Sequence, residues 1–145
     1  KEALYEATLT SLAERMMRDL VACRQADSMQ WLLDYFTSLS KNAYADPTDM
    51  RLVVHALLDS DQNARKWPLK SYLDKVIRIV SETPGGRVTN VSAHLAWVSQ
   101  MIGMTQYHII SVPTVSGMYG TDSATGLQQE MLKRIEDAVR EFCLA

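Results

Sequence analysis

Histidines and cysteines are the residues of this chain with the widest chemical reach, because they bind metals and act as bases or nucleophiles. His55, His94 and His108 lie far apart, and none is three or four residues from another histidine or from a cysteine. A metal site on a helix needs that spacing, since residues three or four positions apart share one face. The sequence therefore predicts no metal site. Each histidine is expected to be a surface or partly buried side chain, and His94, near an apolar stripe, is a candidate for a hydrogen-bonded core position.

Other motifs that carry chemistry are present only as fragments. The acidic turn at residues 59–63 lacks the central glycine and the terminal glutamate of a calcium loop. Ser116-Gly117 follows a predicted helix rather than a strand, unlike a nucleophile elbow, and residues 84–87 lack the lysine and the spacing of a phosphate loop. We therefore expect no enzyme, no cofactor and no small-molecule substrate. A hydrolase built on a helical bundle is the last alternative, because a catalytic pair can assemble from distant residues.

Positive charge gathers in residues 62–90. Six basic residues oppose Asp74 and Glu82 there, a net charge of +4, so the remainder of a chain of net charge −2 carries −6. Such a surface would contact phosphates or an acidic peptide. The simpler interpretation is a solvated helix face, in which Asp74 and Arg78 form an ion pair one turn apart. The candidate partner-binding residues are Arg65, Lys66, Trp67, Lys70, Lys75, Arg78 and Arg87.

The three tryptophans differ in their surroundings. Trp31 and Trp97 lie within apolar stretches and are expected in the core. Trp67 precedes a proline in a polar stretch, so it is expected to be partly exposed. An exposed tryptophan beside basic residues is a plausible anchor for a partner, because tryptophan and arginine are enriched at binding hot spots.

These residues must be positioned by helices, because apolar residues recur at helical spacing along most of the chain. The pattern predicts six helices, at about 2–23, from Asp27 to about 40–42, from Pro47 to 58, at 69–83, from Asn90 to Gly103, and from about 123–126 to 142. Residues 104–110 are an alternative extension of the fifth helix, whose predicted buried stripe is Val91, Leu95, Val98 and Ile102.

Two segments between these helices have clear boundary signals. Asp27, followed by Gln30 three residues later, is a variant of the capping box that begins a helix. Pro84-Gly85-Gly86 is a stop signal for the helix at 69–83. The Gly-, Ser- and Thr-rich stretch 112–126 is expected to be a flexible loop.

The predicted fold is therefore all-α. We expect about six helices to stack as antiparallel hairpins in a short, irregular α/α superhelix, with a closed helical bundle as the alternative. Residues 1–145 fit a single domain. Because the chain begins at Lys1 without a methionine, we expect it to be a fragment of a longer protein.

The two cysteines and the hydropathy of the chain indicate the cellular compartment in which we expect the protein. Cys23 and Cys143 fall within apolar helical patterns, which is typical of free buried thiols in a reducing compartment. No apolar run approaches the length needed to span a bilayer. The expected location is cytoplasmic or otherwise intracellular, without membrane association.

Three short stretches and the order of helices carry a resemblance to a known family. They are Ala26-Asp27-Ser28-Met29-Gln30-Trp31, Leu52-Val53-Val54-His55-Ala56-Leu57-Leu58-Asp59, and Ser71-Tyr72-Leu73-Asp74 through Thr83-Pro84. This succession resembles the C-terminal helical domain of the mRNA-decapping scaffold family known as Hedls or Varicose. The residue-level part covers about 26–86. The resemblance implies a non-catalytic α/α superhelical domain that recruits its parent to cytoplasmic decapping granules (P-bodies) and supports self-association or binding to the decapping machinery.

Three functions follow from these observations, in order of preference. The first is a protein-interaction scaffold domain in mRNA turnover, with protein partners or self-association. The second is an RNA-contacting helical module that uses the basic region 65–87. The third is a viral or bacterial helical assembly protein that self-associates through an exposed apolar patch.

Overall fold

The computed structural model of the protein describes residues 2–59 and 67–144, and the regular elements in these two ranges are all helices. There are seven helices in this part of the chain: α1 (Glu2–Ala22), α2 (Ser28–Ala45), α3 (Thr48–Asp59), α4 (Lys70–Glu82), α5 (Pro84–Arg87), α6 (Val91–Tyr119) and α7 (Thr121–Leu144). The predicted all-α fold of about six helices is confirmed.

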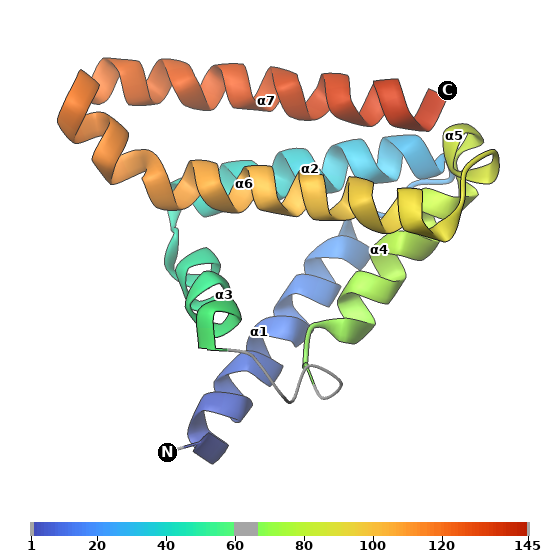
Figure 1. The fold of residues 1–145 in the computed structure, drawn as a ribbon, viewed down its shortest axis with the longest axis horizontal. Helices are drawn as coiled ribbons and strands as arrows, with labels where there is room; N and C mark the ends of the chain where they lie inside the picture. The colour runs from blue at the N-terminus through green and yellow to red at the C-terminus, as the bar shows by residue number, and fades with distance from the viewer. Residues whose placement is uncertain (1, 60–66, 145) are drawn as a thin grey trace.

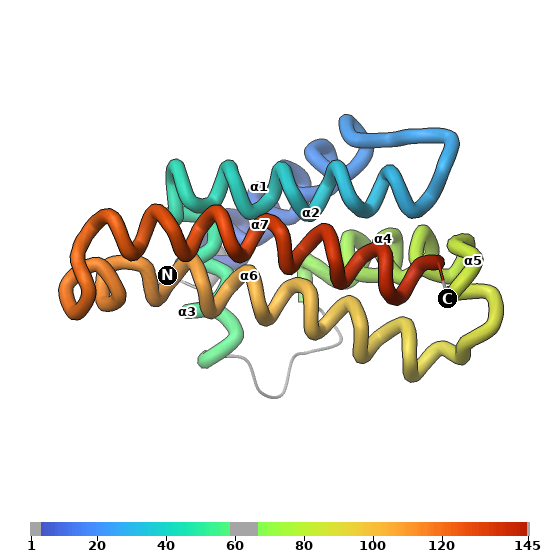
Figure 2. Tube along the Cα trace, turned by 90° about the horizontal axis from the view of Figure 1, so that it is seen from above, coloured from blue at the N-terminus to red at the C-terminus, as the bar shows by residue number. Residues whose placement is uncertain are grey.

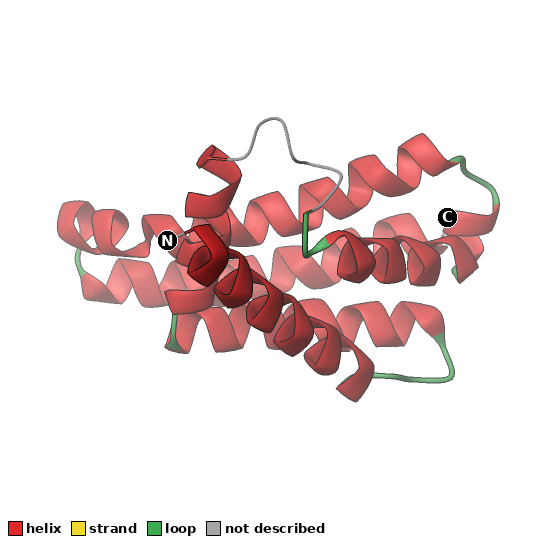
Figure 3. Ribbon diagram, turned by 90° about the horizontal axis from the view of Figure 1, so that it is seen from below, coloured by secondary structure: helices red, strands yellow, loops and turns green. Residues whose placement is uncertain are grey.

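Helices α2, α6 and α7 run alongside one another in one layer, and α1, α3 and α4 lie below it (Figures 1 and 2). Figure 3 shows α1 crossing the underside of this layer at an angle. Because α7 packs along both α2 and α6, the second and the last long helices of the chain are neighbours in space. This contact between helices remote in sequence fits the closed alternative better than a stack in which each hairpin touches only the next.

The physical reason lies in the composition of α2. Five side chains in its second turn and beyond are buried, which leaves almost no polar face in that stretch: Trp31, Leu32, Leu33, Tyr35 and Phe36. A helix that is apolar nearly all round must be surrounded by other elements. Helix α2 accordingly contacts α7, α4, α6 and α3.

An aromatic contact chain crosses this layer. The ring of Phe36 in α2 meets Trp97 of α6 edge to face at a centroid distance of 5.8 Å, and Trp97 stacks on Phe142 of α7 at 5.2 Å. Such pairs add about 0.5–1.5 kcal/mol each beyond the area they bury. Trp31 and Trp97 are both buried, as the sequence predicts.

The local boundary signals at two helices are confirmed. Asp27 accepts a hydrogen bond from the Gln30 backbone N–H at 2.9 Å and thereby begins α2. The Gln30 side chain does not complete the capping box, because its amide donates to Asp34 instead. Helix α4 ends at Glu82, one residue before the predicted end, and the proline-glycine stop opens the four-residue helix α5.

The expected loop at 112–126 and the expected end at Gly103 are wrong. Helix α6 continues for 29 residues through Gly103 and Pro113, and only Gly120, with φ 91°, separates it from α7. Gly103 and Pro113 both lie on the exposed side of α6, and Pro113 has no N–H to bond to the carbonyl four residues earlier. Gly, Ser and Thr are only weak helix breakers, so packing decides the outcome. A buried hydrogen bond of 2.5 Å between His108 Nε2 and Gln128 Oε1 joins α6 to α7 near this turn.

Helix α5 fits its position because its glycines have no side chains. A Cβ at Gly85 would lie 1.8 Å from the backbone oxygen of Phe142 in α7. Gly85→Ala is therefore expected to lower the free energy of unfolding by at least about 3 kcal/mol. The matched control is Gly126→Ala within α7, where a Cβ meets nothing within 4 Å. That variant should gain about 0.5–1 kcal/mol from helix propensity. Urea unfolding measures both, and equal effects would contradict this account.

Candidate functional site

Several of the basic residues singled out in the sequence have acidic or aromatic partners within the described part of the chain. Arg65 and Lys66 lie outside the described residues. In α4, Lys70 pairs with Asp74 at 2.6 Å and Arg78 pairs with Glu82 at 3.7 Å. The predicted pair of Asp74 with Arg78 is thus wrong, because Asp74 pairs with the lysine on its N-terminal side. These exposed pairs add little stability, but they neutralise much of the charge on this face.

Lys75 and Trp67 both contact other residues of the protein itself. The Lys75 ammonium lies 5.7 Å from the ring centroid of Trp31, and the Arg24 guanidinium lies 5.9 Å from the same centroid. Trp67 is half-buried against the main core, which confirms the expected partial exposure. Arg87, at the end of α5, is exposed and forms no ion pair within the described part of the chain. The geometry favours a solvated helix face.

The RNA hypothesis for this face has a direct test. We expect the combined change of Lys70, Lys75 and Arg78 to Ala to leave the affinity for single-stranded RNA unchanged, since two of these cations are already neutralised. The control changes Lys133, Arg134 and Arg140 of α7, where two cations also have ion pairs. Fluorescence anisotropy at low and high salt is the measurement. Steeply salt-dependent binding that only the α4 variant loses would establish the RNA alternative.

Helix α6 has a feature that was not predicted from the sequence. Residues 88–121 contain no Asp, Glu, Lys or Arg, in a chain where 22% of residues are charged. Half of the predicted stripe is confirmed, since Val98 is buried and Ile102 half-buried, whereas Val91 and Leu95 are 72% and 51% exposed. His94, Trp97 and Met101 are buried as well. The run without charge is visible in the sequence, but which side of the helix faces solvent follows only from the packing of α7 and α2. No helix in the described ranges has the length and apolar character that a membrane crossing requires.

Large apolar side chains continue along the exposed side of this helix. Tyr107 is 74% exposed, Met118 62% and Ile110 37%. These three side chains lie within about 80° of one another around the helix axis, and we call the surface that they form the α6 face. Soluble monomers seldom expose a long uncharged surface with several large apolar residues, so the α6 face is a candidate interaction surface.

Two of the three histidines belong to the core. The ring of His94 forms a 2.7 Å hydrogen bond with the Gly86 carbonyl, which confirms the expected core position. His108 is buried as well, against the expectation of a surface position. It stacks on Tyr44 and bonds to Gln128. Among the described residues, no group of three or more histidine, cysteine or acidic side chains is arranged to hold a metal.

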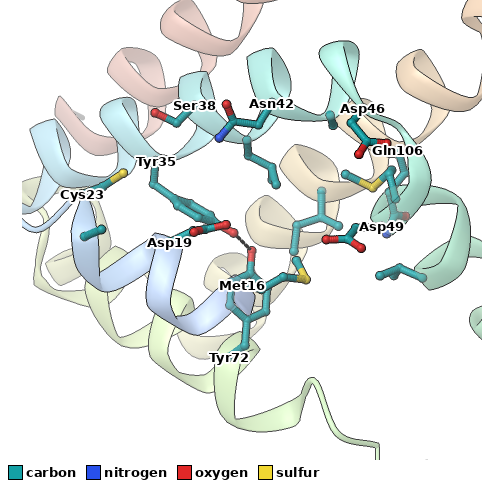
Figure 4. Close-up of a pocket in the computed structure, with 16 residues that line it drawn as sticks. Met16, Asp19, Cys23, Tyr35, Ser38, Asn42, Asp46, Asp49, Tyr72 and Gln106 are labelled. Atoms are coloured by element: carbon teal, nitrogen blue, oxygen red, sulfur yellow. Dashed lines mark hydrogen bonds between the residues drawn. The ribbon is translucent and has the colours of Figure 1, made fainter. Parts of the chain in front are cut away.

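A cavity of about 410 Å³ opens where α1, α2 and α3 meet (Figure 4). One residue of α4 and two residues of α6 also line it. Its apolar wall is formed by Met16, Leu39, Met50, Val53 and Ile102. Three carboxylates, those of Asp19, Asp46 and Asp49, also line it, and among the described residues no lysine, arginine or histidine does. The sequence could not place this cavity, because its residues come from five helices.

Two buried tyrosines form the floor of this cavity. The hydroxyls of Tyr35 and Tyr72 share a 2.5 Å hydrogen bond, and the two residues are 1% and 2% exposed. Burial is the largest cause that raises the pKa of Tyr35 well above its ordinary value, and the neighbouring phenol of Tyr72 is the next. Burial also raises the pKa of Tyr72. Asp19 adds to the rise in both pKa values. Both phenols therefore stay protonated.

The cysteines offer no activated nucleophile. Cys23 lines the cavity and Cys143 is buried, and both are free thiols. Burial raises the pKa of Cys23, opposed by a hydrogen bond with Ser38, and raises the pKa of Cys143 to about 11. A thiol with a raised pKa is largely protonated near neutral pH and reacts slowly.

The tyrosine pair predicts non-additive stability effects. Tyr35→Phe or Tyr72→Phe alone leaves the remaining buried hydroxyl without its partner and should cost about 1–3 kcal/mol, whereas the double variant should cost less than the sum. In the wild type, both tyrosines have raised pKa values when folded, so stability is full below pH 10, the ordinary pKa, and falls as pH rises above it. The double variant should lose stability less steeply there. Urea unfolding between pH 8 and about pH 11 tests both points, and additive losses would contradict the pairing.

Comparison with known proteins gives no match to a family model, to a curated protein or to a solved structure. The resemblance to the decapping scaffold family therefore stays a prediction, and the site must be judged by its geometry.

Proposed function

We propose that this chain is a non-catalytic protein-interaction domain that self-associates through the α6 face. The observation that carries the proposal is the combination of a 29-residue helix without any Asp, Glu, Lys or Arg and several large apolar side chains that point to solvent. Ordinary surface helices place charges on their exposed side.

A second copy of the chain is the occupant that fits this face best. The α6 face has no formal charge to offer a charged partner, and burying it removes no ion from water. In a two-fold dimer the same surface meets itself, so an uncharged face meets an uncharged face without like-charge repulsion. Full burial of a large apolar side chain contributes about 1.5–3 kcal/mol, so a few such residues can supply the core of an interface.

The surface area of the chain leaves room for such an interface. Its accessible surface is 8924 Å², whereas a compact monomer of 16.3 kDa is expected to expose about 7500 Å². Figure 1 shows α1 and α3 diverging from the layer formed by α2, α6 and α7. A standard interface removes about 800 Å² from each partner.

Two more specific functions are compatible with this proposal, and the geometry does not choose between them. Self-association is one of the two roles that the resemblance implies for a cytoplasmic scaffold in mRNA decapping, and it is the role of a viral or bacterial assembly protein. The α6 face serves either one.

Self-association is tested by the mass of the purified chain across a concentration series, by light scattering or sedimentation. The expected mass rises from 16.3 kDa towards twice that value. Changing Tyr107 and Met118 together to Lys should weaken association at least about tenfold, because two ammonium groups would be buried in the interface. Both side chains are more than 60% exposed, so the fold should be retained.

The matched control changes two exposed apolar residues of another helix to Lys, namely Leu4 and Val21 of α1, which are 74% and 48% exposed. This variant should associate like the wild type. A monomeric mass at every concentration, or equal losses in both variants, would refute the α6 face as a self-association surface.

A further inference from the structure

We propose that the cavity between α1, α2 and α3 is a binding site for a small organic cation, namely an ammonium group with a neighbouring hydroxyl on an apolar body. This inference goes beyond the interaction domain proposed above, because Tyr107, Met118 and the rest of the α6 face do not line the cavity. It also departs from the expectation that no small molecule binds.

The charges around the cavity select a cation. Asp49 is neutralised by Arg15, whose Nη2 lies 2.8 Å from Oδ1. Asp46 accepts hydrogen bonds from the Thr48 backbone N–H and hydroxyl, which lowers its pKa and keeps it ionised, yet it has no basic partner. Asp19 forms no hydrogen bond or ion pair within the described residues and lies beside the tyrosine pair in Figure 4. Two uncompensated carboxylates therefore face a cavity without basic side chains.

The tyrosine pair supplies a second, independent requirement. Two phenols carry two O–H donors, and the single bond between Tyr35 and Tyr72 uses one of them. Neither oxygen has another hydrogen-bond partner among the described residues, so the second O–H can donate to an oxygen atom of a molecule bound in the cavity.

The volume and the apolar wall of the cavity indicate the size and the chemical character of the rest of the bound molecule. A volume of about 410 Å³ lies within the usual range for small-molecule sites. The side chains of Met16, Leu39, Met50, Val53 and Ile102 offer an apolar surface to a hydrocarbon or aromatic body. Methionines at two of these positions can adapt to its shape.

Four probes that share one aromatic body separate these requirements: phenylethanolamine, phenethylamine, phenethyl alcohol and phenylacetate. Calorimetry with the full chain at neutral pH should rank the affinities in that order. Removing the hydroxyl of the probe should cost about fivefold, and removing the ammonium about tenfold or more, with no measurable binding of the anion.

Two variants assign the contacts. Asp19→Asn, at an exposed position, should lower phenylethanolamine affinity about tenfold, whereas the control Asp137→Asn on α7 should leave it unchanged. The double variant Tyr35→Phe/Tyr72→Phe keeps the ring packing and removes both hydroxyls, so phenylethanolamine should lose its advantage over phenethylamine. If that variant does not fold, Asp19→Asn decides alone.

Three results would overturn the proposal. The first is no detectable binding of phenylethanolamine at millimolar concentration. The second is equal affinity for the amine and the alcohol probes, which would mean that the carboxylates do not select a cation. The third is an equal response of Asp19→Asn and Asp137→Asn, which would mean that the amine only senses the net charge of the protein.

Discussion

The burial of α2 on nearly all sides is the constraint on which the other packing relationships depend. Leu32 and Phe36 are fully buried, and Trp31, Leu33 and Tyr35 almost so. Covering this stretch requires α7 and α6 above and α4 below, which brings together helices that are remote in sequence. The same requirement sets Tyr35 against Tyr72 and leaves α6 covered on one side only. The core, the cavity floor and the exposed α6 face are thus three results of enclosing one apolar helix.

The sequence predicts those parts of the fold that local interactions decide. The cap at Asp27 and the stop at Pro84 depend on residues within one turn, so their positions were predicted within a residue or so. The stretch 112–126 was mispredicted because its small polar residues have weak preferences, which the contact between α6 and α7 overrides. Asp74 had a basic residue one turn away on each side, and sequence alone does not choose between them.

The candidate sites were harder to predict for the same reason. Tyr35 and Tyr72 are separated by 37 residues, and nothing in either neighbourhood indicates the other. The α6 face was within reach, since a run of 34 uncharged residues at 88–121 is plain in the sequence. Attention to where charge accumulates, at residues 62–90, concealed the importance of where charge is missing.

The pairing of α2 with α7 has a consequence for how this chain is made. During synthesis α2 emerges well before α7, and residues 46–120 separate the end of one from the start of the other. At roughly 5–20 residues per second the ribosome needs several seconds to produce that interval. Throughout it the apolar stretch from Trp31 to Phe36 lacks its main cover, which makes the nascent chain dependent on slow, long-range closure. A cell that produces this protein must keep the incomplete chain from aggregating during that time.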